Sequence, residues 1–455
     1  MKRPNVILIN CDDLGYGDLG CYGSELNRTP AIDALAADGT RFTDFYMASP
    51  VCSPSRAAML TGCYPTRIGF GEFDGRVVLF PGQGIGLDPD ETTVADVFKD
   101  AGYRTKIVGK WHCGDQPRFL PCNYGFDEYY GLPYSNDMGR QSGRAEQFPP
   151  LPLIKDGEVI QQQPDQRALT ERYVEQSLEF ISAACGEPFF LYLAHMHVHL
   201  PLYAAEPFVR ASANGDYGAC VAAVDWATDC IVRKLAEKNL TDDTMIIFTS
   251  DNGSRGDHGA SNAPLRGGKQ TTWEGGMRVP FIIKWPGRVP AGRVSGEMFA
   301  SIDLFPTLAA LCGIEHRPEK KIDGENLSGL VRGERGREGR ATFFYYRQNG
   351  LEAVRRGDWK LHVRKRGERE ERVGLLYDLR ADIGETADLY GERPDVVAEL
   401  SALLDAAREE LGDSYENIIG SGVRECARVE DARPLTEYDE DHPYICAMYD
   451  KSEVG

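Results

Sequence analysis

The 455-residue chain has no apolar run long enough to span a bilayer, which argues against a membrane-spanning protein. Its 12 cysteines show no CxxC pair and no regular spacing, so neither a disulfide scaffold nor a zinc-finger pattern is expected. The chain also lacks an excess of positive charge, because 70 acidic residues outnumber 51 basic ones and give a net charge of -19. This balance argues against nucleic acid or an anionic membrane as a partner. An anionic substrate would need a locally positive pocket.

The N-terminus has no secretory signal pattern. In MKRPNVILIN, two basic residues and a proline precede a short apolar run, which is too short for a signal segment and has no small-residue cleavage site. The run is therefore interpreted as a first strand. The chain as given is expected to be cytoplasmic, and a periplasmic or secreted location is the alternative if an export signal has been removed.

Short buried-strand patterns alternate with helical ones through the first three hundred residues. Strands are expected at 5–9, 103–109, 188–195 and 244–250, and helices at 29–39 (capped by Thr29), 92–102, 169–184 and 217–239. This alternation predicts an α/β fold with a large mixed, mostly parallel β-sheet flanked by helices. No internal repeat is visible.

A change of composition to Gly, Arg and Glu at 329–340 predicts a domain boundary, with one domain at 1–335 and a smaller one at 336–455. Segments 341–346, 352–363 and 373–379 are expected to form strands of a small antiparallel sheet, followed by a helix at 394–411. The smaller domain is thus expected to be an α+β subdomain. The last forty residues are polar and irregular, and they are expected to wrap the surface.

Polar side chains follow two of the expected strands. Asp12 and Asp13 come after the first strand, and Asp251 and Asn252 come after the strand at 244–250. Either group alone is more simply explained as a turn or a cap. Ligands in an open parallel sheet bind beyond the carboxyl ends of the strands, so the two groups together favour a metal site. Three carboxylates and an amide oxygen suit Ca²⁺, with Mg²⁺ as second choice.

The segment VCSPSRAAMLTG, residues 51–62, places a thiol just ahead of a helix. An isolated cysteine such as Cys52 is most often a small buried hydrophobe. Pro54 suits the first turn of a helix, however, and Arg56 would lie about one turn from Cys52. The N-terminus of a helix beside a cation lowers the pKa of a thiol or attracts an anion. The segment is therefore expected to supply a nucleophile, an anion cradle, or both.

Basic residues also gather after strands. Lys110 and His112 follow the strand at 103–109, and their spacing in an extended segment would point both side chains the same way. His195, His197 and His199 alternate after the strand at 188–195, so four of the eight histidines lie at strand ends. Each alone could be a surface or core histidine. The glycine-rich loop at 264–280 carries Lys269.

These motifs together resemble the sulfatase family of the alkaline-phosphatase-like superfamily, in the branch of arylsulfatase A and N-acetylgalactosamine-6-sulfatase. The C-x-P-S-R-x-x-x-L-T-G signature is present, and the motifs CDDLGYGDLGCYG, VGKWHCG, GLPYSND, TSDNG and GGKQTTWEGG follow in the family's order. GDWKL and LYDLRADIGET extend the resemblance into the C-terminal part. The signature residues are Cys52, Pro54, Ser55, Arg56, Leu60, Thr61 and Gly62.

The resemblance implies that Cys52 is oxidised to formylglycine by a formylglycine-generating enzyme that reads the CxPSR run. One oxygen of the aldehyde hydrate would attack sulfur, and loss of a proton from the other would expel sulfate. The metal ligands implied by the resemblance are Asp12, Asp13, Cys52, Asp251 and Asn252.

The resemblance also implies a role for each basic residue. Arg56 and Lys110 would steady the hydrate, and His112 would take the proton that expels sulfate. His199 would protonate the leaving oxygen and is preferred over His197. Lys269 would bind a sulfate oxygen, and Ser135 would lie near the sulfate.

Some features differ from the family or stay open. Cys11, Cys63 and Cys113 place extra thiols near the expected site, which favours a reducing compartment. The substrate is expected to be an aryl sulfate or a sulfated carbohydrate. Two alternatives are a phosphodiesterase or phosphonate monoester hydrolase of the same superfamily, and a non-catalytic binder of sulfated glycans with Cys52 unmodified.

The sequence names no particular sulfated substrate. Loops at 70–90, 114–122 and 136–165 are expected to line the outer pocket. Arg140, Arg144 and His258 could contact an anionic glycan, although a solvated face is the commoner fate of such residues.

Overall fold

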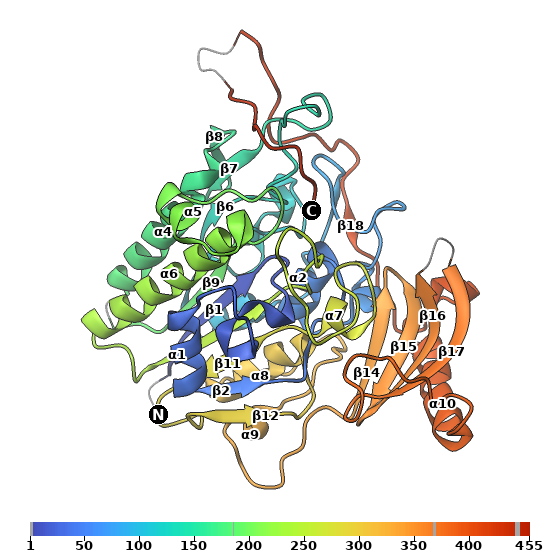
Figure 1. Cartoon of the computed structure of the whole chain (residues 1–455). Helices are drawn as coiled ribbons and strands as arrows, with labels where there is room; N and C mark the ends of the chain where they lie inside the picture. Colours follow the sequence, from blue (N-terminus) through green and yellow to red (C-terminus); the bar gives the residue numbers. More distant parts are fainter. Residues whose placement is uncertain (1–2, 185, 367–369, 442–445) are drawn as a thin grey trace.

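The computed structural model describes residues 3–184, 186–366, 370–441 and 446–455, and a ten-stranded sheet forms its centre (Figure 1). The strand order is β12-β2-β11-β10-β1-β9-β5-β6-β7-β8. The five consecutive strands from β10 to β6 pair in parallel, whereas β11 and β7 pair antiparallel with their neighbours. The strands in chain order are β1 (Asn5–Cys11), β2 (Thr40–Phe42), β5 (Arg104–Gly109), β6 (Glu128–Gly131), β7 (Pro152–Lys155), β8 (Glu158–Gln162), β9 (Phe189–Ala194), β10 (Thr244–Ser250), β11 (Phe281–Lys284) and β12 (Arg293–Ser295). The predicted mixed, mostly parallel sheet is confirmed.

Strand β1 lies at the centre of the sheet and is buried over its whole length. Alternate residues face opposite sides, so Val6 and Leu8 belong to one core cluster and Ile7 and Ile9 to another. The first cluster includes residues of α2, α3 and α8, and the second includes residues of α1, α4 and α6. Helices thus cover both faces (Figure 1). Their bounds are α1 (Pro30–Asp38), α2 (Cys52–Thr61), α3 (Val94–Asp100), α4 (Leu169–Ala183), α6 (Gly215–Glu237) and α8 (Leu304–Leu311).

The four helices and four strands expected in this region are all present, with ends shifted by a few residues. Thr29 is the N-cap residue of α1, as expected, but its side chain bonds elsewhere. Its hydroxyl accepts a hydrogen bond from the Gly20 N–H at 2.9 Å, and no side-chain cap bond to α1 forms. Thr93, in contrast, caps α3 by accepting from the Asp96 N–H.

The C-terminal part contains a separate four-stranded antiparallel sheet packed against a long helix. The elements are β14 (Thr342–Arg347), β15 (Gly350–Arg356), β16 (Trp359–Arg366), β17 (Glu370–Asp378) and α10 (Pro394–Leu411). Segment 352–363, expected to be one strand, is instead parts of two. The chain turns between Arg356 and Trp359, where Gly357 has a φ of 57°.

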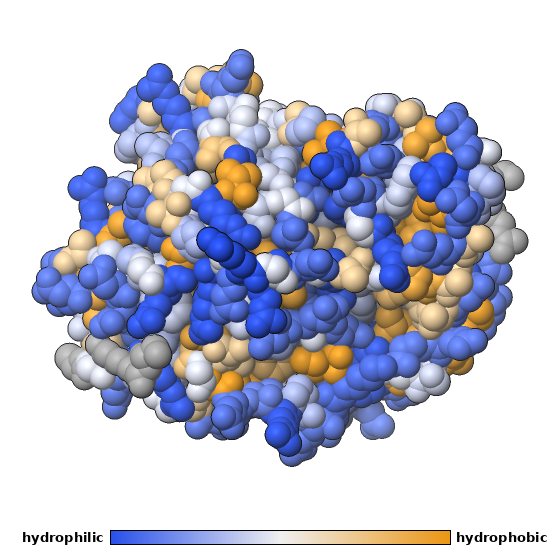
Figure 2. All heavy atoms as spheres, turned by 90° about the horizontal axis from the view of Figure 1, so that it is seen from below, coloured by the Kyte–Doolittle hydropathy of each residue, from blue (hydrophilic) through white to orange (hydrophobic). Residues whose placement is uncertain are grey.

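Polar loops make up most of the chain after α10, as expected. Among the residues described there, regular structure is limited to a short helical turn at Ser414–Glu416 and the strand β18 (Ala427–Arg428), which pairs with β4 (Ile85–Gly86). On the face seen in Figure 2, hydrophobic residues lie in patches between hydrophilic ones. Within the described ranges, no helix is long and apolar enough to cross a membrane.

Candidate active site

The acidic residues meet because two parallel strands end at the same height. Cys11 of β1 is in register with Ser250 of β10, so Asp12 and Asp251 leave the sheet side by side. The Asp13 N–H donates to Asp251 Oδ1 at 3.2 Å. Asp13 has a φ of 61°, a left-handed backbone that is strained for a residue with a Cβ. The chain therefore turns sharply here and aims two successive carboxylates into one site.

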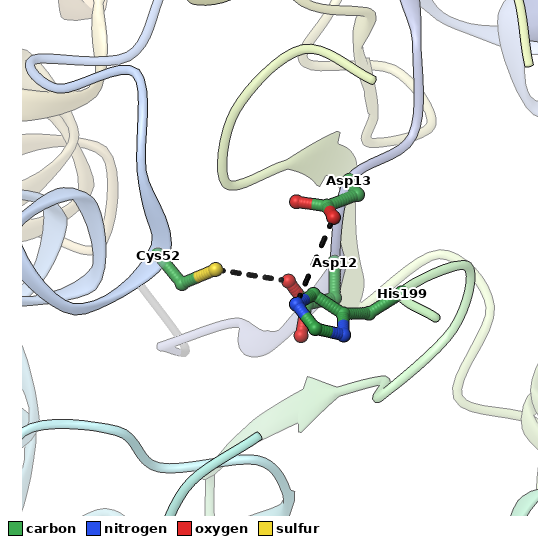
Figure 3. Close-up of side chains that lie close together, drawn as sticks. All are labelled: Asp12, Asp13, Cys52 and His199. Carbon is green, nitrogen blue, oxygen red and sulfur yellow. Dashed lines mark hydrogen bonds and ion pairs between the residues drawn. The ribbon is translucent and has the colours of Figure 1, made fainter. Parts of the chain in front are cut away.

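Four buried side chains converge on this point from three segments of the chain (Figure 3). One ligand atom each of Asp12, Asp13, Cys52 and His199 lies within 4.8 Å of the others. The Cys52 thiol lies 3.3 Å from Asp12 Oδ1, and His199 Nε2 lies 3.8 Å from Asp13 Oδ2. Asp251 and Asn252 adjoin this cluster through Asp13, to which Asn252 Nδ2 donates at 2.7 Å.

Three cations enclose the carboxylates. Lys110 Nζ lies 2.5 Å from Asp12 Oδ2, and Lys269 Nζ lies 2.8 Å from Asp13 Oδ2. Arg56 binds Asp251 Oδ2 through Nε at 2.8 Å and Nη2 at 2.7 Å. The side chains are at most 5% exposed, so these pairs are almost unscreened by water.

The charges perturb each other strongly. Burial would raise the pKa of Asp12, but Lys110, His199 and Arg56 outweigh it and hold that pKa well below its usual range. Burial and the charge of Asp12 raise the pKa of Asp251. Neighbouring carboxylates raise each other's pKa, and a bound cation would favour the ionised form of both.

The donor set fits a hard divalent cation. It consists of three carboxylates and an amide, and oxygen donors of this kind suit Ca²⁺ or Mg²⁺. Asn252 Oδ1 is buried and has no hydrogen-bond partner among the described residues. An orphaned oxygen beside carboxylates is a further potential ligand atom, so the residues present fit a metal.

The expectation that the start of α2 and Arg56 lower the pKa of Cys52 is wrong for the thiol. Burial and the charge of Asp12 raise that pKa well above its usual value. Arg56 is directed to Asp251 and to the Lys110 carbonyl, which accepts from Nη1 at 2.9 Å. A thiol with a raised pKa is a weaker nucleophile, because the reactive form is the thiolate.

Two histidines have hydrogen bonds that define their chemistry. His112 Nε2 lies 3.0 Å from the Leu79 carbonyl, which can only accept, so Nε2 carries the proton and Nδ1 keeps its lone pair. Burial and Lys110 lower the pKa of His112 well below its usual value, which keeps the ring neutral. His199 likewise donates from Nδ1 to the Leu200 carbonyl at 2.6 Å, which leaves Nε2 facing Asp13.

The remaining basic and hydroxyl residues take different places. Ser135 Oγ accepts from Lys110 Nζ at 2.7 Å and so adjoins the cluster. His195 and His197 lie outside it, and burial lowers their pKa values to about 3 and about 4. The extended segment expected at Lys110 to His112 is wrong at its end, because His112 has a φ of 63°.

Comparison with known proteins identifies the relationship. A family model described as Sulfatase matches residues 4–314, and a model described as N-sulphoglucosamine sulphohydrolase, C-terminal, matches residues 268–410. The chain belongs to the sulfatase family. It is 41% identical to N-acetylgalactosamine-6-sulfatase of Canis lupus familiaris over 379 residues, which cover 79% of this chain and 72% of the relative.

Other relatives cover more of this sulfatase. Arylsulfatase A of Homo sapiens is 38% identical over 476 residues, covering 94% of this chain and 92% of the relative. The crystal structure of Ps i-CgsB in complex with k-i-k-neocarrahexaose superposes with a TM-score of 0.79 at 31% identity, covering 93% and 95% of the two chains. A phosphonate monoester hydrolase of Agrobacterium radiobacter has a TM-score of 0.65 at 21% identity, which shows the shared fold.

The sulfatase site opens into a pocket of about 230 Å³. Of the loops expected to line it, 70–90 contributes Val77, Val78 and Phe80, and 136–165 contributes residues from Asp137 to Phe148. The expectation for 114–122 is wrong, since no residue of that loop lines this pocket.

The three residues considered as contacts for an anionic glycan lie in different places in the structure. Arg144 lines the pocket, whereas Arg140 stacks over Tyr438 and His258 is exposed beside Asp257. The last residues were expected only to wrap the surface, but Val454 and Gly455 line the pocket as well. The C-terminal segment ends above α2 (Figure 1).

Sequence reasoning missed Asp137. This residue lies two positions after Ser135 in the GLPYSND motif, lines the pocket and is 4% exposed. The only indication in the sequence was that this carboxylate lies close to Ser135, which was already assigned to the site.

Proposed function

We propose that this sulfatase hydrolyses the sulfate ester of a carbohydrate or an aryl alcohol through a formylglycine made from Cys52, with Ca²⁺ as its metal. The observation that carries the proposal is the convergence of Cys52 on Asp12, Asp13 and His199 in a buried cluster enclosed by three cations. Relatives named as sulfatases of N-acetylgalactosamine and of aryl esters support this substrate range.

In this proposal, Asp12, Asp13, Asp251 and Asn252 hold the cation together with residue 52. The bound ion would neutralise the carboxylates and polarise sulfate oxygens. Asp13 and Lys269 already form an ion pair at 2.8 Å, so a sulfate oxygen can exchange for part of that contact and receive the lysine's hydrogen bond.

The chain's own residues supply the proton transfers. Neutral His112 presents an unprotonated Nδ1 and acts as the base that expels sulfate from residue 52. His199 presents Nε2 to the pocket side of Asp13 and, when protonated there, donates to the leaving oxygen. Lys110, bonded to Asp12 and Ser135, and Arg56, fixed on Asp251, hold the attacking group in place.

Conversion of Cys52 has to take place before folding. The residue is 1% exposed, and every residue of α2 is buried. A formylglycine-generating enzyme cannot reach the CxPSR run in the folded protein, so the unfolded chain is its partner. The raised thiol pKa gives a reason for the conversion, because the unmodified side chain would be a weak nucleophile.

The test combines mass spectrometry with kinetics. The peptide that contains residue 52 should exchange one sulfur for one oxygen and lose two hydrogens, and the protein should hydrolyse 4-nitrophenyl sulfate faster than an aryl phosphate diester. Cys52→Ala should abolish turnover, whereas Cys230→Ala, a half-buried cysteine on α6, should leave it unchanged. Faster hydrolysis of the diester, or full activity with an unmodified Cys52, would contradict the proposal.

A further inference from the structure

Asp137 places a buried carboxylate inside a pocket whose chemistry is directed at an anion. Its side chain lines the pocket together with Cys52, His199 and Lys269, and the residue is 4% exposed. Its Oδ1 is buried and has no hydrogen-bond partner among the described residues. Such an acceptor repels a sulfate group and is costly to leave unpaired. It therefore requires a donor that does not belong to the sulfate.

The structure shows where a donor approaches this carboxylate. The Gly455 N–H donates to Asp137 Oδ2 at 3.3 Å. The same Gly455 lies against the imidazole of His199, so closely that an added Cβ would collide with the ring. One small group thus bridges Asp137 and His199, the residue proposed to protonate the leaving oxygen. A leaving alcohol bound at His199 would bring its neighbouring substituents to Asp137.

The other walls of the pocket complete a site for a ring with both apolar and polar edges. Phe80 and Phe148 lie side by side with ring centroids 5.7 Å apart, and both line the pocket. Aromatic and aliphatic walls bind the C–H faces of a ring, while a few convergent polar groups fix its orientation. The pocket volume of about 230 Å³ accommodates one ring rather than a long chain.

We propose that Asp137 is a specificity-determining residue that accepts hydrogen bonds from hydroxyl or amino groups on the leaving alcohol. It thereby favours sulfate esters of sugars over aryl sulfates. An aryl sulfate carries no donor beside the ester oxygen, so it leaves Asp137 Oδ1 without a partner. The inference rests on the proposed function. In the present structure, the Gly455 N–H holds the position of the substrate's donor, and residues Val454 and Gly455 move aside when a sugar binds.

The experiment compares two substrate types in two variants. For Asp137→Ala, kcat/KM on monosaccharide sulfates should fall by about 10-fold or more, because the sugar hydroxyls lose their acceptor. On 4-nitrophenyl sulfate it should stay within about threefold of the wild type, since that substrate makes no such bond. Asp137→Asn, which keeps one acceptor oxygen, should lie between. Asp229→Asn, on the exposed face of α6, is the matched control.

The outcomes separate this inference from the function on which it rests. A selective loss on sugar sulfates supports the inference. A parallel loss on both substrate types indicates a structural role, and no loss on either shows that Asp137 does not contact the alcohol; both results overturn the inference. A wild type that carries formylglycine but hydrolyses no sulfate ester overturns the proposed function instead.

Discussion

Lys360 joins the small C-terminal sheet to the glycine-rich loop of the active site. From β16, its Nζ donates to the Thr272 carbonyl at 2.9 Å, to Glu274 Oε1 at 2.9 Å, and to Glu385 Oε1 at 2.8 Å. The lysine and both glutamates are fully buried. Lys360→Met keeps the length and apolar stem of the side chain but removes the charge, so two buried carboxylates lose their shared cation.

The magnitude follows from what remains around each carboxylate. Removing one partner of a buried ion pair costs about 3–5 kcal/mol of unfolding free energy, because the other charge stays buried. Glu274 keeps Arg278 at 3.3 Å and the Tyr345 hydroxyl at 2.9 Å. Glu385 keeps the His362 ring at 3.2 Å. With these partners retained, we expect Lys360→Met to lower the stability by about 3 kcal/mol at pH 7.

Urea unfolding at pH 7 measures this loss, with Lys234→Met as the matched control. Lys234 lies on α6 and pairs with Glu237, whose side chain is 60% exposed. A surface pair of this kind contributes about 0.5 kcal/mol or less. A loss for Lys360→Met that is no larger than the loss for Lys234→Met would refute the reasoning.

The pH dependence provides a second check on the same variant. Burial would raise the pKa of Glu274, but Lys360, Arg278 and Arg355 hold it far below its ordinary value. A carboxyl with a depressed pKa contributes stability that is lost as the pH falls. Lys360→Met has less of this contribution to lose. The difference in free energy of unfolding between the variant and the wild type should therefore become smaller below about pH 5. A difference that stays constant or widens contradicts the assigned charges.

Two further predictions concern a buried histidine near the site and the metal ligands. Burial lowers the pKa of His195 to about 3. As the pH falls, this histidine therefore takes up a proton in the unfolded chain before it does so in the folded protein. The folded protein loses stability below the unfolded pKa of about 6.5 as a result. Between pH 7 and pH 5, the free energy of unfolding measured with urea should therefore fall by about 2 kcal/mol less for His195→Leu than for the wild type. Equal decreases would contradict a neutral buried ring. Ca²⁺ at about 100 times its Kd should stabilise the wild type by about 2.7 kcal/mol in thermal unfolding but should not stabilise Asp13→Asn, and an equal shift in both would exclude Asp13 as a ligand.

The sheet and the acidic part of the site are predictable because they depend on local pattern and strand register. Continuous apolar runs mark β1 and β10, and parallel pairing necessarily brings the residues after them together. The two runs alone therefore predict Asp12 and Asp251 at one edge of the sheet. The helix over Cys52–Thr61 is likewise indicated by Pro54 and by the glycine at 62.

Features that depend on distant parts of the chain could not be predicted. The pKa of Cys52 is dominated by burial under segments far away in the sequence, whereas the local pattern showed only a helix start and an arginine. Asp137 became a candidate only because Gly455 donates to it and because it lines one pocket with His199. The positive φ at His112 could not be predicted either, since few residues other than glycine adopt it.

The charges of the site explain how an acidic protein binds an anionic ester. When all three are ionised, Asp12, Asp13 and Asp251 balance Arg56, Lys110 and Lys269, so the cluster then has no excess of either sign. A divalent cation adds two positive charges, against one negative charge on a sulfate monoester. The net charge of -19 is spread over the molecule and is screened beyond about 8–10 Å at physiological salt, whereas the buried cluster is not. A bound divalent cation, as proposed above, would therefore make the field that the sulfate meets positive.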